Sequence, residues 1–452
     1  MKALDPMNKA LLSLLLLLAV VTHSQARQPN VILIYTDDQG TIDVNCYGAK
    51  DLTTPHMDGL AKRGVKFTQF YSAAPVCSPS RAAVITGRYP QRAQIPGNVS
   101  SAHGHAGMPE SQITMAEVFR KAGYATAHIG KWHLGYDQAT MPNNQGFDYS
   151  FGHMGGCIDN YSHFFYWNGP NRHDLWQNGN EIWRDGKYFP QLMVDEANHF
   201  IETHQDKPFF MYFAMNIPHY PLQGTEKWRQ HYKDLEAPRR MYATLISTMD
   251  EMIGKLVAQI ESLGLRKDTI IVFQSDHGHS QEERTFGGGG SAGIYRGAKF
   301  SLFEGGIRVP AIISWPGHLP EDATREQLAT AVDWYPTLAK LAGVDNITHR
   351  IDGSDISELI HSGDAKTPHD VFHWQTGRGN NAPWAVRKGD WKLLGNPRDT
   401  SNKAPVTATD KLFLTNLTED PSELKNMAKT NPELVAELLK LHQQWVIDVQ
   451  QQ

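Results

Sequence analysis

Four apolar segments of this chain each lead into polar residues, and this arrangement limits the possible folds more than any other feature. The segments are residues 30–36, 125–129, 209–215 and 269–274, all rich in β-branched or aromatic side chains, which is typical of buried strands. The polar residues that follow them are Asp37 and Asp38, Lys131 and His133, His219, and Asp276 and His277. Ligands bind beyond the carboxyl ends of the strands in open parallel sheets. We therefore expect these residues to face one crevice.

Helical patterns separate the strand-like segments. We predict helices over residues 55–63, 80–86, 114–122, 191–204 and 239–263, with a further strand at 309–315. Residues 153–190 are irregular and rich in aromatic side chains. The alternation of strands and helices predicts an α/β fold in which helices cover both faces of a large, mostly parallel sheet.

The pattern changes after about residue 365. Short strand-like segments occur at 371–374, 384–387, 391–394 and 411–416, with turn residues between them, and a helical pattern follows at 432–449. This predicts a smaller antiparallel sheet with a terminal helix. We therefore divide the chain into a catalytic α/β domain over residues 27–365 and a C-terminal α+β subdomain over residues 366–452.

The first 26 residues are typical of an export signal. Lys2 and Lys9 precede an apolar run from Leu11 to Val21, and Ser24-Gln25-Ala26 is a small-residue cleavage site. The apolar run is short for a membrane anchor. Three cysteines are too few for a disulfide framework, which favours a bacterial periplasmic or secreted protein. The net charge of −5, without clustered basic residues, argues against nucleic acid as a partner.

The segment from Pro75 to Pro90 reads Pro-Val-Cys-Ser-Pro-Ser-Arg-Ala-Ala-Val-Ile-Thr-Gly-Arg-Tyr-Pro. We expect its loop to place Cys77 at the mouth of a helix that begins near Ser80, with the Ser80 hydroxyl as its cap. Arg81 follows Cys77 by about one helical turn, so its guanidinium can fold back over residue 77. The helix end and the guanidinium together favour an anion. The alternative is that Cys77 is a small buried hydrophobic residue.

The Cys-x-Pro-Ser-Arg and Thr-Gly-Arg elements of this segment resemble the signature of the type I sulfatases, in the alkaline phosphatase superfamily. The resemblance covers nearly the whole chain after the export signal, and the wording of the motifs is most similar to the arylsulfatase and N-acetylgalactosamine-sulfatase branch. It implies that Cys77 is oxidised to formylglycine by a formylglycine-generating enzyme or an anaerobic maturase. The hydrated aldehyde is then the nucleophile.

Asp37, Asp38 and Asp276 predict a site for a hard divalent cation, because adjacent carboxylates repel each other unless a cation lies between them. The alternative is that one of these residues caps a helix or a turn. The resemblance implies one Ca²⁺ ion, which also contacts residue 77. Many family members have asparagine where this chain has His277. His277 is then either a weak metal ligand or a residue that only lines the site.

Four further residues acquire roles through the resemblance. It implies that Lys131 and Lys299 bind the sulfate, that His133 hydrogen-bonds the diol, and that His219 donates a proton to the leaving oxygen, as a group that titrates near neutral pH can do. Lys299 lies in a second motif that resembles a family signature, Gly-Ala-Lys-Phe-Ser-Leu-Phe-Glu-Gly-Gly-Ile-Arg-Val-Pro. A serine that some members place in the loop at 155–157 is not evident here.

These observations predict a sulfuric ester hydrolase that releases sulfate from a sulfated saccharide, with galactose or N-acetylgalactosamine sulfate as the expected unit. The aromatic residues at 160–188 can form platforms for sugar faces, or can simply pack their own loop. Two alternatives remain at this stage. The same fold and signature also serve phosphonate and phosphodiester hydrolases, and a chain in which residue 77 stays cysteine would be a catalytically silent binding protein for sulfated sugars.

Overall fold

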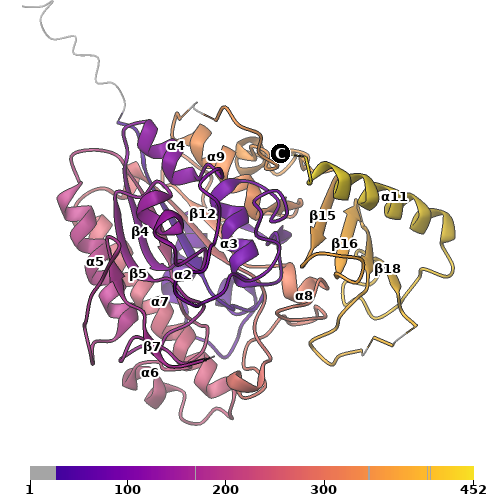
Figure 1. The fold of residues 1–452 in the computed structure, drawn as a ribbon, viewed down its shortest axis with the longest axis horizontal. Coiled ribbons are helices and arrows are strands. Elements are labelled where there is room, and N and C mark those ends of the chain that lie inside the picture. Colours follow the sequence, from indigo (N-terminus) through magenta and orange to yellow (C-terminus); the bar gives the residue numbers. More distant parts are fainter. Residues whose placement is uncertain (1–26, 168, 345–346, 405, 408, 452) are drawn as a thin grey trace, which may run out of the picture.

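The computed structural model describes residues 27–451, apart from 168, 345–346, 405 and 408 (Figure 1). The predicted export signal, residues 1–26, lies outside the described residues. Among the residues that are described, no helix has the length and apolar character needed to cross a membrane.

A ten-stranded sheet forms the centre of the molecule. In spatial order its strands are β13 (Ala323–Arg325), β2 (Val65–Phe67), β12 (Ala311–Ser314), β11 (Thr269–Ser275), β1 (Asn30–Thr36), β10 (Phe209–Ala214), β4 (Ala125–Lys131), β5 (Tyr149–His153), β8 (Trp176–Gln177) and β9 (Asn180–Glu181). The five strands from β11 to β5 are mutually parallel, whereas β12 and β8 run antiparallel to their neighbours. The carboxyl ends of the central strands therefore lie at one edge of the sheet.

Helices cover both faces of this sheet (Figure 1). One face packs against α2 (Pro55–Lys62), α5 (Phe189–Thr203) and α7 (Arg239–Ser262), and α6 (Glu226–His231) packs on α7. The other face packs against α3 (Cys77–Thr86), α4 (Met115–Lys121), α9 (Trp334–Leu341) and α10 (Ser357–His361). The short helix α8 (Glu304–Ile307) follows the Lys299 segment.

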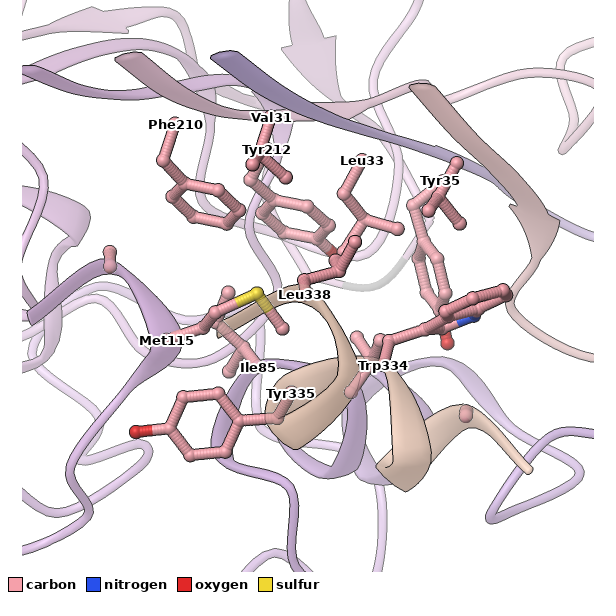
Figure 2. Packing of buried hydrophobic residues seen from close by; sticks show 14 of the residues in the cluster. Val31, Leu33, Tyr35, Ile85, Met115, Phe210, Tyr212, Trp334, Tyr335 and Leu338 are labelled. Atoms are coloured by element: carbon pink, nitrogen blue, oxygen red, sulfur yellow. The ribbon is translucent and has the colours of Figure 1, made fainter. Parts of the chain in front are cut away.

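The central strand β1 shows how the sequence produces these two layers. Val31, Leu33 and Tyr35 belong to one hydrophobic cluster, whereas Ile32 and Ile34 belong to the cluster on the opposite face, because successive side chains of a strand point to opposite faces. Figure 2 shows the first cluster, in which the β1 side chains lie over Ile85, Met115, Trp334, Tyr335 and Leu338. All five β1 residues are fully buried, and burial of each contributes about 1.5–3 kcal/mol for a side chain of this size.

A second, antiparallel sheet lies beside the large one (Figure 1). It consists of β15 (Val371–Gln375), β16 (Trp384–Lys388), β17 (Trp391–Gly395) and β18 (Leu412–Asn416), and α11 (Pro432–Asp448) packs on it. Phe372 and Trp374 share a hydrophobic cluster with residues of α3 and α8. Lys392 Nζ lies 2.9 Å from Glu304 Oε1 and 3.1 Å from Glu423 Oε1, with all three side chains buried. The predicted fold class is therefore confirmed.

The structure differs from the predicted elements at four places. Helix α3 begins at Cys77 rather than near Ser80, and no side chain caps it. The prediction that Ser80 is the cap is wrong, because its hydroxyl instead donates to the Asp276 carbonyl, at 2.5 Å. The strand expected at 309–315 is the shorter β12. The irregular segment 153–190 contains the hairpin of β6 (Phe164–Phe165) and β7 (Arg172–His173), and a further pair joins β3 (Phe70–Tyr71) to β14 (Ala329–Thr330).

Candidate active site

The predicted site residues meet at the carboxyl edge of the parallel strands. Ligand atoms of Asp37, Cys77, Asp276 and His277 all lie within 4.8 Å of one another, and so do those of Asp37, Asp38, Cys77 and His219. They come from the ends of β1, β10 and β11 and from the first turn of α3. The expectation that these distant segments share one crevice agrees with the geometry.

Cys77 is the first residue of α3 and is only 2% exposed. Its Sγ lies 3.7 Å from Asp37 Oδ1 and 3.4 Å from His277 Nε2. Burial favours the neutral thiol, yet Lys131 and Lys299 hold the pKa of Cys77 well below its usual range. The same positive groups, together with the helix N-terminus, stabilise any anion at this point. The surroundings of Cys77 are thus charged rather than apolar.

Two buried lysines pair with the two adjacent carboxylates. Lys131 Nζ lies 2.6 Å from Asp37 Oδ2, and Lys299 Nζ lies 2.9 Å from Asp38. Burial would lower the pKa of each lysine, but Asp37 raises that of Lys131 and Asp38 raises that of Lys299. Both ammonium groups are therefore charged at neutral pH.

Arg81 lies fully buried beneath the cluster. Its Nη2 is 3.3 Å from Asp276 Oδ2 and 3.5 Å from Asp37 Oδ1, and its Nη1 donates to the Lys131 carbonyl. The guanidinium thus lies between two buried carboxylates, with which a charged group interacts strongly. The expected approach of this guanidinium to residue 77 stays a prediction.

His277 points its Nε2 into the cluster. The ring is oriented by a 2.9 Å hydrogen bond between Nδ1 and the Gly278 carbonyl, and Nε2 lies 3.4 Å from Asp38 Oδ1 and 3.5 Å from Asp276 Oδ2. Burial alone would lower the pKa of His277, but Asp276 and Cys77 raise it to about 9. The ring therefore contacts the carboxylate cluster directly, and the choice between a weak metal ligand and a lining residue stays a prediction.

A cleft of about 460 Å³ leads from solvent to Cys77. His133, His219 and Lys299 line it close to residue 77. His219 Nδ1 hydrogen-bonds to the Tyr220 carbonyl at 2.8 Å, and its Nε2 lies 3.7 Å from Asp38 Oδ2. One ring nitrogen is thus held by the backbone while the other is next to a carboxylate. This is the arrangement that orients an acid–base histidine.

The outer wall of the cleft contains residues that no sequence motif identified. Phe165 and Trp167 come from the aromatic segment that we singled out, whereas Arg172, Tyr220 and Arg284 do not follow from any pattern. The Arg284 guanidinium lies 3.3 Å from the centroid of the Trp167 ring. Trp167 remains 50% exposed. Only the tertiary structure places these side chains beside the cluster.

Two serines from another segment of the chain line the cleft beside residues 155–157. Ser100 and Ser101 line the cleft together with Gly156 and Cys157. The Ser101 hydroxyl accepts a hydrogen bond from the Gly156 backbone at 2.9 Å. A hydroxyl from a segment about 55 positions away in sequence thus lies at this wall.

Comparisons with known proteins find relatives over nearly the whole described chain. The family model described as "Sulfatase" matches residues 29–344, and the model described as "N-sulphoglucosamine sulphohydrolase, C-terminal" matches residues 292–451. Arylsulfatase A of Homo sapiens is 33% identical over 95% of this chain and 90% of its own length. N-acetylgalactosamine-6-sulfatase of Rattus norvegicus is 32% identical over 85% of this chain and 75% of its own length.

A solved structure extends these comparisons to the fold. The crystal structure of Ps i-CgsB in complex with k-i-k-neocarrahexaose superimposes with a TM-score of 0.82 at 30% identity, over 93% of each chain. The match covers more of the chain than the domain that contains the ten-stranded sheet, so it includes the smaller antiparallel sheet as well. From the two family models and these relatives, the chain belongs to the sulfatase family and is a sulfuric ester hydrolase with the alkaline-phosphatase-like fold.

Proposed function

We propose that this enzyme removes sulfate from a sulfated saccharide, with galactose or N-acetylgalactosamine sulfate as the target unit. The cleft supports this, because Phe165, Trp167 and Tyr220 offer aromatic surface beside the positively charged cluster. Sugar rings pack on such surfaces, while charged groups bind the sulfate. The relatives include an N-acetylgalactosamine-6-sulfatase and a protein solved with a neocarrahexaose. The single observation that carries the proposal is the convergence of Cys77, the carboxylates and both lysines at the bottom of this cleft.

We propose that residue 77 acts as formylglycine, formed from Cys77 by a maturase, and that its hydrated aldehyde supplies the nucleophile. The position fits this group, because a small side chain at the helix start faces the cleft between Lys131, Lys299 and His133. The Asp276 carboxylate, within 4.8 Å of residue 77, accepts the proton that residue 77 releases. Burial raises the pKa of this carboxyl, which favours that role. Arg81 keeps that carboxylate in position.

The donor set also fits one divalent cation, which we propose to be Ca²⁺. The buried Asp37 and Asp276 gather with Cys77 and His277, and Asp37 and the buried Asp38 gather with Cys77 and His219. His277 Nε2 links the two groups, because it also lies 3.4 Å from Asp38 Oδ1. Asp38 Oδ1 accepts no hydrogen bond of suitable geometry from the described residues, although Lys299 Nζ lies 2.9 Å from it. When bound, the ion would polarise a sulfate oxygen and offset the carboxylate charges. The carboxylates would hold the ion through oxygen atoms, as calcium prefers, and His277 would hold it through one nitrogen.

The remaining side chains bind and orient the substrate. Lys131 and Lys299 neutralise the developing negative charge on the transferred group, which is the main requirement of such a transfer. His219 donates a proton from Nε2 to the leaving oxygen, while its Nδ1 stays fixed on the Tyr220 carbonyl. His133, also in the cleft, contacts residue 77. We further propose that the protein acts after export, in the periplasm or outside the cell.

The test is sulfate release from a panel of defined sulfated sugars, combined with the mass of the tryptic peptide that spans residues 67–81. We expect release from a galactose or N-acetylgalactosamine sulfate, and a peptide lighter than the cysteine form. The Cys77→Ala variant is the control. Faster turnover of a phosphodiester than of the matching sulfate ester would favour a phosphonate or phosphodiester hydrolase instead. An unmodified Cys77 together with sugar binding and no turnover would favour a silent binding protein.

A further inference from the structure

A second group of metal-ligating side chains lies in the hairpin segment, separate from the residues of the active-site cluster. It consists of His163, His173 and Asp185, and one ligand atom from each lies within 4.8 Å of the others. The two histidines are buried, at 0% and 5% exposure, whereas Asp185 is exposed to solvent. None of the three lines the active-site cleft. The sulfatase motifs therefore do not account for this group.

Each of the two histidines uses one ring nitrogen in a hydrogen bond and has no hydrogen-bond partner among the described residues for the other. His173 Nδ1 lies 2.9 Å from Glu181 Oε1, and His163 Nε2 lies 2.9 Å from the Lys187 carbonyl oxygen. A carboxylate and a carbonyl only accept hydrogen bonds, so these two nitrogens carry the protons. The opposite nitrogens, His163 Nδ1 and His173 Nε2, are buried and have no partner among the described residues.

Two bare imidazole nitrogens in one place are costly unless something binds them. A buried polar atom without a partner costs free energy, and the lone pairs of both rings are available to the same ligand. A cation that accepts imidazole nitrogen removes this cost, and the carboxylate of Asp185 supplies the charge.

We propose that His163 Nδ1, His173 Nε2 and the Asp185 carboxylate bind a divalent transition-metal ion of the zinc class, with solvent in the remaining position. Two imidazoles and one carboxylate form a ligand set that suits zinc and not calcium, which prefers oxygen. The hydrogen bond from His173 to Glu181 is the outer contact that metal-binding histidines make to a carboxylate. The ring of His173 is further held by Trp183, stacked at 3.7 Å.

The position of this site gives it a structural role. His163 precedes β6 and His173 lies in β7, and the backbone N–H of Asp174 donates to the His163 carbonyl at 2.9 Å. The two rings therefore lie at the base of the hairpin whose outer part carries Phe165, Trp167 and Arg172 into the cleft wall. An ion bound at the base ties the two strands together and connects them to the 181–187 segment.

The test is zinc binding to the full-length enzyme after chelation, measured by calorimetry with excess Ca²⁺ present to occupy the active-site carboxylates. We expect one equivalent of Zn²⁺ that is lost in His163→Gln and in His173→Gln. Glu181→Gln should weaken binding on the order of 10- to 100-fold, as loss of an outer contact does. The Co²⁺ derivative should show a visible absorption spectrum that changes in Asp185→Asn.

Two controls make the outcome decisive. His277→Asn removes the imidazole of the active-site cluster and should leave this equivalent of zinc intact. His204→Gln removes a histidine outside both clusters and should have no effect. Asp185 and Glu181 are solvent-accessible, so their variants report on binding even if a histidine variant fails to fold. Zinc binding that survives Asp185→Asn and Glu181→Gln unchanged, or that disappears in His277→Asn, would overturn the proposal.

Discussion

The sulfur of Cys77 lies 3.4 Å from Nε2 of His277, although 200 positions separate the two residues along the chain. One belongs to the start of α3 and the other to the loop after β11. Their contact brings the nucleophile position and the unusual member of the proposed metal site together. It also places an imidazole where the resemblance led us to expect an asparagine.

Replacement of Cys77 by Ala should abolish turnover in a protein that still folds. Alanine cannot be oxidised to an aldehyde, so the proposed nucleophile is lost, while the removal of one sulfur atom leaves the packing of α3 nearly intact. Sulfate release and the thermal unfolding midpoint measure the two effects. Cys46→Ala, at a half-buried cysteine outside the site, should keep its turnover. Normal activity of Cys77→Ala would remove the nucleophile assignment.

Replacement of His219 by Ala should lower kcat about 10²- to 10⁴-fold for a sugar sulfate, the usual contribution of a positioned general acid. The leaving oxygen of an activated aryl sulfate departs without a proton donor, so kcat for that substrate should fall much less. Steady-state kinetics with both substrates measure the difference. Equal losses on the two substrates would contradict the role of His219 as a proton donor.

Replacement of His277 by Asn should change the metal preference of the active site. An amide oxygen in place of the imidazole nitrogen suits calcium, so we expect Ca²⁺ to bind about tenfold more tightly, or ~1.4 kcal/mol, and Mn²⁺ to lose affinity relative to it. Calorimetric titration of the chelated protein measures both ions. Asp38→Asn is a control with the opposite expected effect, because it removes a charged ligand and should lower the affinity for both Ca²⁺ and Mn²⁺. An unchanged Ca²⁺ affinity in His277→Asn would show that the ring only lines the site.

Replacement of Trp167 by Ala should raise KM for the saccharide about tenfold, or ~1.4 kcal/mol, with little change in kcat. This exposed ring lies at the outer wall and under the Arg284 guanidinium, away from the reacting group. A small aryl sulfate should show no such increase. The matched control is Trp391→Ala, on the smaller sheet. A fall in kcat with an unchanged KM would assign Trp167 to the chemical step instead.

Replacement of His373 by Phe should make the protein less sensitive to acid. Burial lowers the pKa of His373 to about 3, and the unfolded histidine titrates near its ordinary value of about 6.5. The unfolded state therefore binds one more proton between these pH values, so the stabilising contribution is present above about pH 6.5 and is lost as the pH falls toward 3. Phenylalanine can retain the stacking with Trp445 and does not titrate.

The measurement is the free energy of unfolding from urea denaturation at several pH values between 4 and 6. The slope against pH should be shallower in His373→Phe than in the wild type by about 1.4 kcal/mol per pH unit, the value for one proton. His199→Phe, at an exposed position of α5, controls for the removal of an imidazole from the surface. Identical slopes in wild type and His373→Phe would contradict the assignment.

Much of this protein follows from local sequence patterns. The apolar run of β1 predicts a strand, and the long amphipathic pattern of α7 predicts a helix. Both predictions work because the spacing of apolar residues along the chain determines which side chains are buried. The polar residues after the strands predict a shared crevice, because parallel strands end at one edge. The resemblance of the Cys77 segment and the Lys299 segment to sulfatase motifs identified the family, which the comparisons confirm. The roles of individual site residues stay predictions.

The tertiary structure alone decided how those parts meet. It pairs Lys131 with Asp37 and Lys299 with Asp38, turns the Ser80 hydroxyl to the Asp276 carbonyl, and brings Arg284 over Trp167. It also joins His163 and His173 at the base of one hairpin. The physical reason is that local patterns depend on neighbours within a few positions. Ion pairs, cleft walls and metal sites depend on side chains that only the packing of distant elements brings within a few ångströms.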